Sequence, residues 1–185
     1  MDSIVAIKDD RALFDEIFLP NLAESYRLAR WLTGNASDAE DVVQDAAIRA
    51  FRGIKGFGAI NARAWALTIV RDTAYSWLLK NRPKSVVLTE DLHFDEQQQI
   101  EFENIHIERH ITPEQNLINE SDIENVRNAI SSLPALFREV IVLREIHQLN
   151  YRDIAEVVNI PIGTVMSRLS RARKFLIAHL GDPRS

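Results

Sequence analysis

Apolar residues recur at intervals of three and four positions along most of this chain, which is the spacing of one face of an α-helix. Glycine and proline, which interrupt helices, occur only six times each in 185 residues. We therefore expect an all-α fold. The periodicity weakens over residues 88–120, which contain a QQQ run, many acids and a proline. This composition favours an extended linker between two small helical domains.

Charge is segregated along the chain. The formal net charge of −5 argues by itself against a nucleic-acid binder. However, residues 46–84 carry eight basic residues and one acidic residue, and residues 161–185 carry five and one. The linker, placed at residues 85–120 between domains at 1–84 and 121–185, carries nine acidic residues and one basic. Because local charge sets the field at a site, two surfaces for a polyanion are expected, although solvated faces would give the same pattern.

Several classes of site and location are disfavoured by composition. The chain has no cysteine, and its five histidines form no HExxH motif, so we expect no metal site, no cofactor and no thiol chemistry. No catalytic residue is identified, and an enzyme is the least favoured class. The N-terminus lacks a signal-length apolar stretch, and nowhere do 18 apolar residues run together. We expect a cytoplasmic protein without membrane insertion.

Helices are predicted over residues 11–18 and 21–32, and a third follows a capping-box sequence, Ser37 to Glu40. This third helix extends to about Phe51 and should bury Ala39, Val42, Val43, Ala46 and Ala50. Its opposite face begins with acids that capping and the helix dipole explain: Asp38, Glu40 and Asp41. Neither effect explains Gln44 and Asp45. A docking surface for a basic partner is the alternative.

A loop at residues 55–61 contains Phe57 between two glycines and ends in Asn61, a residue suited to cap the helix predicted over residues 62–80. One stripe of this helix suits a core: Trp65, Ile69 and either Thr73 or Ala66. The basic and aromatic residues around the helix, with Arg82 beyond it, are Arg63, Trp65, Arg71, Tyr75, Trp77, Lys80 and Arg82. Bases stack on rings while cations contact phosphates, so this helix suits single-stranded nucleic acid. Core packing explains some of the rings, Trp65 above all.

The C-terminal part has the pattern of a helix-turn-helix. A helix opens at Leu133-Pro134, a short one covers residues 151–158 after a cap-like Asn150, and Pro161 precedes the last. The last helix has one apolar stripe: Ile162, Val165, Leu169, Ala172 and Leu176. Opposite that stripe are polar and basic residues: Thr164, Ser167, Arg168, Arg171 and Lys174. Such a helix suits the DNA major groove, although a basic face can also be a merely soluble one.

Three stretches of the chain resemble the extracytoplasmic-function (ECF) sigma factors of bacterial RNA polymerase. They are SDAEDVVQDAAIRAFRGI, NARAWALTIVRDTAYSWL and LPALFREVIVLREIHQLNYRDIAEVVNIPIGTVMSRLSRARKFL. The resemblance implies a sigma-2 domain up to about residue 84 and a sigma-4 domain over residues 121–180. It further implies that sigma-4 also contacts the polymerase β flap and that an anti-sigma factor regulates the chain.

The resemblance also assigns residues to partners. The face that would dock on the clamp coiled coil of the polymerase β′ subunit is Asp38, Glu40, Asp41, Gln44 and Asp45. The residues that would capture a flipped base and hold the melted minus-ten strand are Phe57, Asn61, Arg63, Arg71, Tyr75 and Lys80. The minus-thirty-five element of promoter DNA would be contacted by Thr164, Ser167, Arg168, Arg171 and Lys174. The acidic linker would pass through the polymerase. That its negative charge mimics RNA there is a hypothesis.

Three positions depart from the family pattern. Asp72 replaces a usual Asn, Met166 a frequent Lys, and Pro161 a frequent Ser, which leaves a DNA contact at the first two in doubt. Two other classes remain open beside a sigma factor. A stand-alone helix-turn-helix repressor would need a dimerisation helix. A decoy that binds an anti-sigma factor usually carries a receiver domain, which we do not find.

Overall fold

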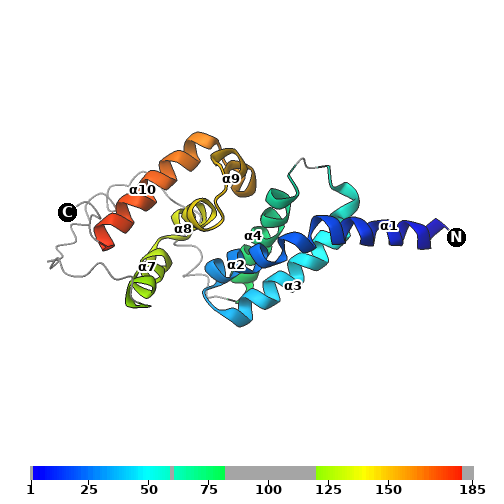
Figure 1. Cartoon of the computed structure of the whole chain (residues 1–185), viewed down its shortest axis with the longest axis horizontal. Coiled ribbons are helices and arrows are strands. Elements are labelled where there is room, and N and C mark those ends of the chain that lie inside the picture. Colours follow the sequence, from blue (N-terminus) through cyan, green and yellow to red (C-terminus); the bar gives the residue numbers. More distant parts are fainter. Residues whose placement is uncertain (1, 59–60, 82–119, 181–185) are drawn as a thin grey trace.

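The computed structural model describes residues 2–58, 61–81 and 120–180, and these residues form helices and turns without any strand (Figure 1). One group comprises α1 (Asp2–Ile17), α2 (Leu22–Thr33), α3 (Ala36–Gly53) and α4 (Ala62–Asn81). The other comprises α7 (Glu120–Ser132), α8 (Ala135–Ile141), α9 (Tyr151–Val158) and α10 (Ile162–Leu180). The all-α prediction is confirmed. The predicted linker, residues 85–120, lies outside the described residues except for its last residue, which begins α7.

In the first group, α2, α3 and α4 pack on one another, and α1 lies along α3 and projects beyond it toward the N-terminus (Figure 1). Phe18, Leu28, Val42 and Leu67 are fully buried between these helices. The predicted helix at residues 11–18 is longer than expected, because α1 begins at Asp2. Leu22, the first residue of α2, is 39% exposed.

The turn between α2 and α3 has caps on both sides. Gly34, at φ 87°, ends α2 in the left-handed conformation that glycine adopts without strain. Asn35 then begins α3, and its side chain accepts a hydrogen bond of 2.8 Å from the Asp38 amide. The predicted cap, Ser37, is therefore wrong by two residues. The predicted buried face of α3 is confirmed at all five of its positions.

The second group contains the predicted helix-turn-helix. Asn150 caps α9 by accepting from the amides of Arg152 and Asp153. Asn159, at φ 57°, ends α9 in the left-handed region and redirects the chain into α10. On α10, Val165, Leu169 and Ala172 are buried as predicted, whereas Ile162, at 44% exposure, is not.

The chain upstream of α9 differs in two ways from the predicted pattern. The helix predicted from Leu133 ends as α8 and passes into a π-helical turn at Val142–Ile146, and Pro134 is its N-cap rather than its first residue. The helix α7 was not predicted. Within residues 2–58, 61–81 and 120–180, no helix combines the length and apolar content that crossing a membrane requires.

The two groups of helices lie against each other. Helix α4 packs against α9, and α2 touches α8 and the π-helical turn (Figure 1). Helix α4 therefore has neighbours on two sides, and small residues such as Ala64, Ala66 and Ala74 occupy its buried positions. Of the predicted stripe, Thr73 and Ala66 are buried, whereas Trp65 and Ile69 are half-buried and pack against the core. The contact between the two groups of helices also covers some charged side chains and leaves others exposed to solvent.

Candidate nucleic-acid interface

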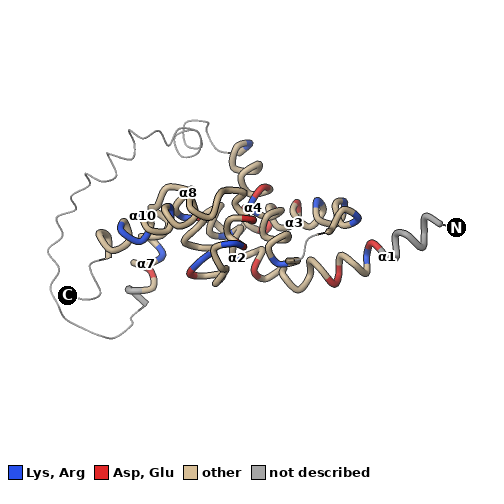
Figure 2. The backbone as a smooth tube through the Cα atoms, turned by 90° about the horizontal axis from the view of Figure 1, so that it is seen from above, with Lys and Arg blue, Asp and Glu red and all other residues tan. Residues whose placement is uncertain are grey.

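The acidic face of α3 lies away from the core. The opposite side of the helix is buried, and Glu40, Asp41, Gln44 and Asp45 are exposed. Asp38 lies at its start and accepts from the side chain of Asn35. Among the described residues, none of the four exposed side chains has a hydrogen bond or ion pair. Figure 2 shows the acidic positions of α3 and the basic positions of α10 on different helices. The α3 face is thus free to meet a basic partner.

The start of α4 is organised by Asn61. Its side-chain oxygen accepts a 3.1 Å hydrogen bond from the Ala64 amide, which confirms the predicted cap. Phe57 packs edge-to-face on Trp65, with ring centroids 5.2 Å apart. Asn61 also borders an open cleft of about 820 Å³ that continues to the first turn of α9. Gly58 and Asn61 therefore border open space between the two groups of helices, whereas Phe57 packs on α4.

Arg63, near the start of α4, bridges three elements. Its guanidinium donates to both oxygens of Glu24 on α2, at 2.5 and 2.6 Å, and to the carbonyl of His147 after the π-helical turn. The hydrogen bonds from Arg63 lower the pKa of Glu24. The bond to Glu24 likewise raises the pKa of Arg63. Arg63 is therefore engaged within the chain rather than directed at solvent.

The side chain of His147 is buried beside this junction. Its Nδ1 lies 3.9 Å from Glu24 Oε1, and neither ring nitrogen has a hydrogen-bond partner among the described residues. Burial lowers its pKa to about 4, against the opposing charge of Glu24. The ring is thus neutral at pH 7. Protonation would place a positive charge on this buried ring, so acid should weaken the contact among Arg63, Glu24 and His147.

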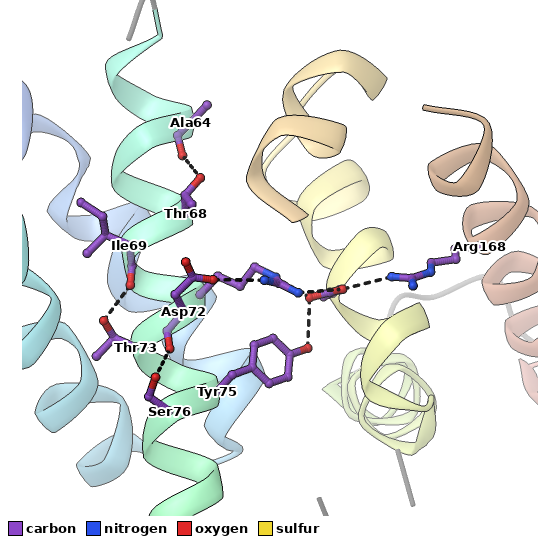
Figure 3. A network of polar contacts seen from close by, with 10 residues as sticks. Ala64, Thr68, Ile69, Asp72, Thr73, Tyr75, Ser76 and Arg168 are labelled. Atoms are coloured by element: carbon purple, nitrogen blue, oxygen red, sulfur yellow. Dashed lines mark hydrogen bonds and ion pairs between the residues drawn. The ribbon is translucent and has the colours of Figure 1, made fainter. Parts of the chain in front are cut away.

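Glu139 of α8 is a buried carboxylate that joins the two groups of helices. Figure 3 shows Tyr75 of α4 and Arg168 of α10 pointing into the space between their helices, where dashed lines mark their contacts. Arg71 Nε of α4 donates to Glu139 Oε2 at 2.8 Å, and the Tyr75 hydroxyl donates to the same oxygen at 3.0 Å. Arg168 of α10 donates to Oε1 at 3.4 Å. Burial alone would lower the pKa of Arg71, but the charge and hydrogen bonds of Glu139 raise it. Donors from two groups of helices therefore compensate one buried charge.

Arg71 and Tyr75 were expected on a free outer face of α4, and in this arrangement they are not. The Arg71 side chain is only 18% exposed, and its guanidinium carbon lies 4.9 Å from the centroid of the Tyr75 ring. Lys80, one turn beyond, is exposed as expected. The predicted basic helix face is thus divided between a covered part and a free part.

On α10 the predicted DNA-facing residues lie on the side opposite the buried stripe. Ser167 and Lys174 are exposed, and Thr164 and Arg171 are half-buried. The Ser167 hydroxyl donates to the Thr164 carbonyl at 3.0 Å. Arg168 is the exception, because its guanidinium is turned toward Glu139. Four of the five side chains therefore remain available on this face.

Sequence reasoning missed Glu139, Glu24 and His147. One signal could have identified Glu139: it is the lone acid in the run ALFREVIV, and its helical neighbours Ala135 and Leu143 are buried. Such an acid needs a cationic partner. Nothing in the local sequence indicates that the partner is Arg71, 68 positions earlier.

Comparisons with known proteins identify the family. Residues 17–83 match the model for sigma-70 region 2, and residues 123–176 match that for sigma-70 region 4. The chain is 33% identical to the RNA polymerase sigma-H factor of Pseudomonas aeruginosa, over 90% of this chain and 86% of the relative. It is 30% identical to the ECF RNA polymerase sigma factor SigW of Bacillus subtilis, over 95% of this chain and 92% of the relative.

Solved structures agree with these matches. The sigma factor RpoE from Bartonella quintana, in complex with the anti-sigma factor NepR, superposes with a TM-score of 0.67 at 28% identity, covering 92% of this chain and 98% of that one. CnrH, in complex with the cytosolic domain of CnrY, has the same fold. It superposes with a TM-score of 0.62 at 20% identity, covering 95% of this chain and 92% of that one. With two family regions in their order and relatives matched over most of their length, the chain belongs to the sigma-70 family as an ECF sigma factor.

Proposed function

We propose that this chain binds core RNA polymerase and directs transcription initiation at a specific class of promoters. The observation that carries the proposal is the presence, in one chain, of a free acidic helix face on α3 and a helix-turn-helix at α9 and α10. The first suits a protein partner and the second suits duplex DNA. A repressor would need only the second. On this proposal the chain is a binding subunit rather than an enzyme and acts in the cytoplasm.

The acidic face of α3 is the proposed contact with the clamp coiled coil of the β′ subunit. Its residues are Asp38, Glu40, Asp41, Gln44 and Asp45. The exposed carboxylates have no partner among the described residues, so a basic helix can approach without displacing an internal ion pair. Charged, exposed contacts of this kind chiefly accelerate association and fix orientation.

We assign promoter contacts to α4 with the loop before it, and to α10. Residues 1–84 are the proposed sigma-2 domain, where minus-ten DNA is contacted by Phe57, Asn61, Arg63, Arg71, Tyr75 and Lys80. Residues 121–185 are the proposed sigma-4 domain, where the minus-thirty-five element is contacted by Thr164, Ser167, Arg168, Arg171 and Lys174. The linker at 85–120 connects them. Arginine suits guanine edges, whereas Ser, Thr and Lys more often contact phosphates.

An anti-sigma factor is the proposed regulator. The family resemblance implies one, and the solved structure of RpoE from Bartonella quintana is described as a complex with the anti-sigma factor NepR. Such a partner would cover the polymerase-binding faces of the chain. The polymerase β flap is the proposed second docking point, for the sigma-4 domain.

In vitro transcription with core polymerase on a pool of genomic fragments tests the main proposal. We expect transcripts that start at a common promoter motif only when chain and core are both present. A variant with Asp41→Asn and Asp45→Asn should lose core binding, while Asp15→Asn, an exposed acid on α1, should not. Absence of core-dependent initiation, or DNA-binding repression without core, would overturn the proposal.

A further inference from the structure

We propose that Glu139 is the centre of an intramolecular latch that keeps the free chain closed and holds two of its proposed DNA-contacting side chains, Arg71 and Tyr75, inward. The inference rests on the proposed function for the roles of Arg71, Tyr75 and Arg168. It concerns the conformation of the chain by itself, before any partner binds. The consequence is that promoter contact requires the two groups of helices to separate.

The latch is satisfied only in the closed arrangement. Glu139 has an exposure of 0%, and its two carboxylate oxygens accept from Arg71, Tyr75 and Arg168 at distances of 2.8 to 3.5 Å. A buried carboxylate without such donors would be strongly destabilising. Arg168 and Glu139 belong to the same group of helices, whereas Arg71 and Tyr75 come from α4. When the groups separate, Glu139 keeps Arg168 and exchanges the α4 donors for water.

The closed arrangement excludes DNA contact by the same atoms. Arg71 uses Nε and one terminal nitrogen on Glu139 and the other on Asp72, so each guanidinium nitrogen already has an acceptor. The Tyr75 hydroxyl is used on Glu139, and the Arg71 guanidinium lies over the Tyr75 ring. A base cannot stack on a ring face that is covered in this way. Binding of a nucleic-acid strand and closure of the latch are therefore mutually exclusive.

A second contact strengthens closure at the other end of α4. Arg63 bonds Glu24 within its own group and the His147 carbonyl of the opposite group. Arg63 is also a proposed minus-ten contact. The hydrogen bonds that join the two groups thus come from Arg63, Arg71 and Tyr75, all of which are assigned to DNA, and this links closure to the loss of strand binding.

The test measures the distance between the two groups in the full chain. The chain has no cysteine, so Ser37→Cys with Ser170→Cys places two dyes at exposed positions of α3 and α10. Single-molecule energy transfer should show a predominantly short distance. Glu139→Gln preserves side-chain shape but removes the charge, and should raise the open-to-closed ratio about tenfold. Glu145→Gln is the matched control, because it breaks only an exposed pair with Arg173 within one group.

The same variants are then titrated with a single-stranded oligodeoxynucleotide of mixed sequence. Apparent affinity scales with the fraction of chain that is open. The affinity of Glu139→Gln for the oligonucleotide should therefore rise by about the same factor as its open fraction. A long distance in the unmodified chain overturns the latch. The latch is also overturned if Glu139→Gln folds but leaves the distance between the dyes unchanged. It is equally overturned if Glu139→Gln opens the chain without increasing its affinity for the oligonucleotide.

If Glu139→Gln fails to fold by circular dichroism, Tyr75→Phe replaces it in the distance measurement, where we expect an opening of about threefold from one lost hydrogen bond. An unchanged distance would again overturn the latch. These distances need neither polymerase nor promoter. A chain that initiates transcription but is open when free refutes only the latch, and a closed chain that never initiates refutes only the proposed function.

Discussion

Arg63 donates two hydrogen bonds to the carboxylate of Glu24, at 2.5 and 2.6 Å, and ties the start of α4 to α2 across 39 positions of sequence. The buried ring of His147 lies beside this pair, 3.9 Å from the carboxylate. Two groups with lowered pKa values therefore share one junction between the helix groups. Acid should weaken that junction in two separate steps.

The first step involves His147. Burial lowers its pKa from 6.5 to about 4, so between these values the unfolded chain binds more protons than the folded chain. Stability is then fully present above pH 6.5 and falls as the pH falls toward 4. We expect a loss of roughly 3 kcal/mol across this window, measured by urea unfolding at successive pH values. His147→Leu should flatten the profile between pH 6.5 and 4.5, and an unchanged slope there would contradict the assignment.

The second step involves Glu24, whose pKa is lowered chiefly by the hydrogen bonds from Arg63. Its contribution is present above the ordinary pKa of 4.5 and is lost as the pH falls through the lowered value. We expect Glu24→Gln to lower the free energy of unfolding at pH 7 by about 1 kcal/mol, because the pair is partly solvated. Glu40→Gln, on an exposed position of α3, is the control and should change little.

The cap of α3 gives a test that separates two neighbouring side chains. Asn35 accepts from the Asp38 amide, whereas Ser37 lies within the first turn, so Asn35→Ala should lower the free energy of unfolding by about 1 kcal/mol. Ser37→Ala should change it by less than about 0.5 kcal/mol. Thermal unfolding of both variants measures the difference. Equal losses would mean that the helix begins at the capping box instead.

Features with a local cause were largely predictable from the sequence. The bounds of α4 and α9 and the buried face of α3 follow from caps and from apolar spacing, which need no knowledge of neighbours. The predicted start of α3 was wrong because Asn35 and Ser37 are both good caps in sequence. Only the backbone conformation after Gly34 distinguishes them.

Features that depend on how the two groups meet were not predictable. Trp65 and Ile69 have the helical spacing of a core stripe, yet α4 has neighbours on two sides and fully buries other positions, among them Leu67 and Val70. Likewise, Arg71 and Tyr75 look like free nucleic-acid contacts until the position of Glu139 is known. Contacts across a linker leave no periodic signal in either segment. The candidate residues were therefore identifiable by type, but their closed state was not.

Arg171 is the residue of α10 best suited to test the minus-thirty-five assignment, because Arg168 is engaged with Glu139 and Arg171 lies on the proposed DNA face. We expect Arg171→Ala to weaken holoenzyme binding to a minus-thirty-five duplex about tenfold and to leave association with core polymerase unchanged. The matched control is Arg173→Ala on the same helix, whose guanidinium bonds Glu145 at 2.8 Å and should contribute little to DNA binding. Filter binding of the duplex and a separate core-association assay measure the two effects. If Arg171→Ala reduced both by the same factor, α10 would contact the polymerase rather than the promoter, because a DNA-facing side chain has no reason to alter core affinity.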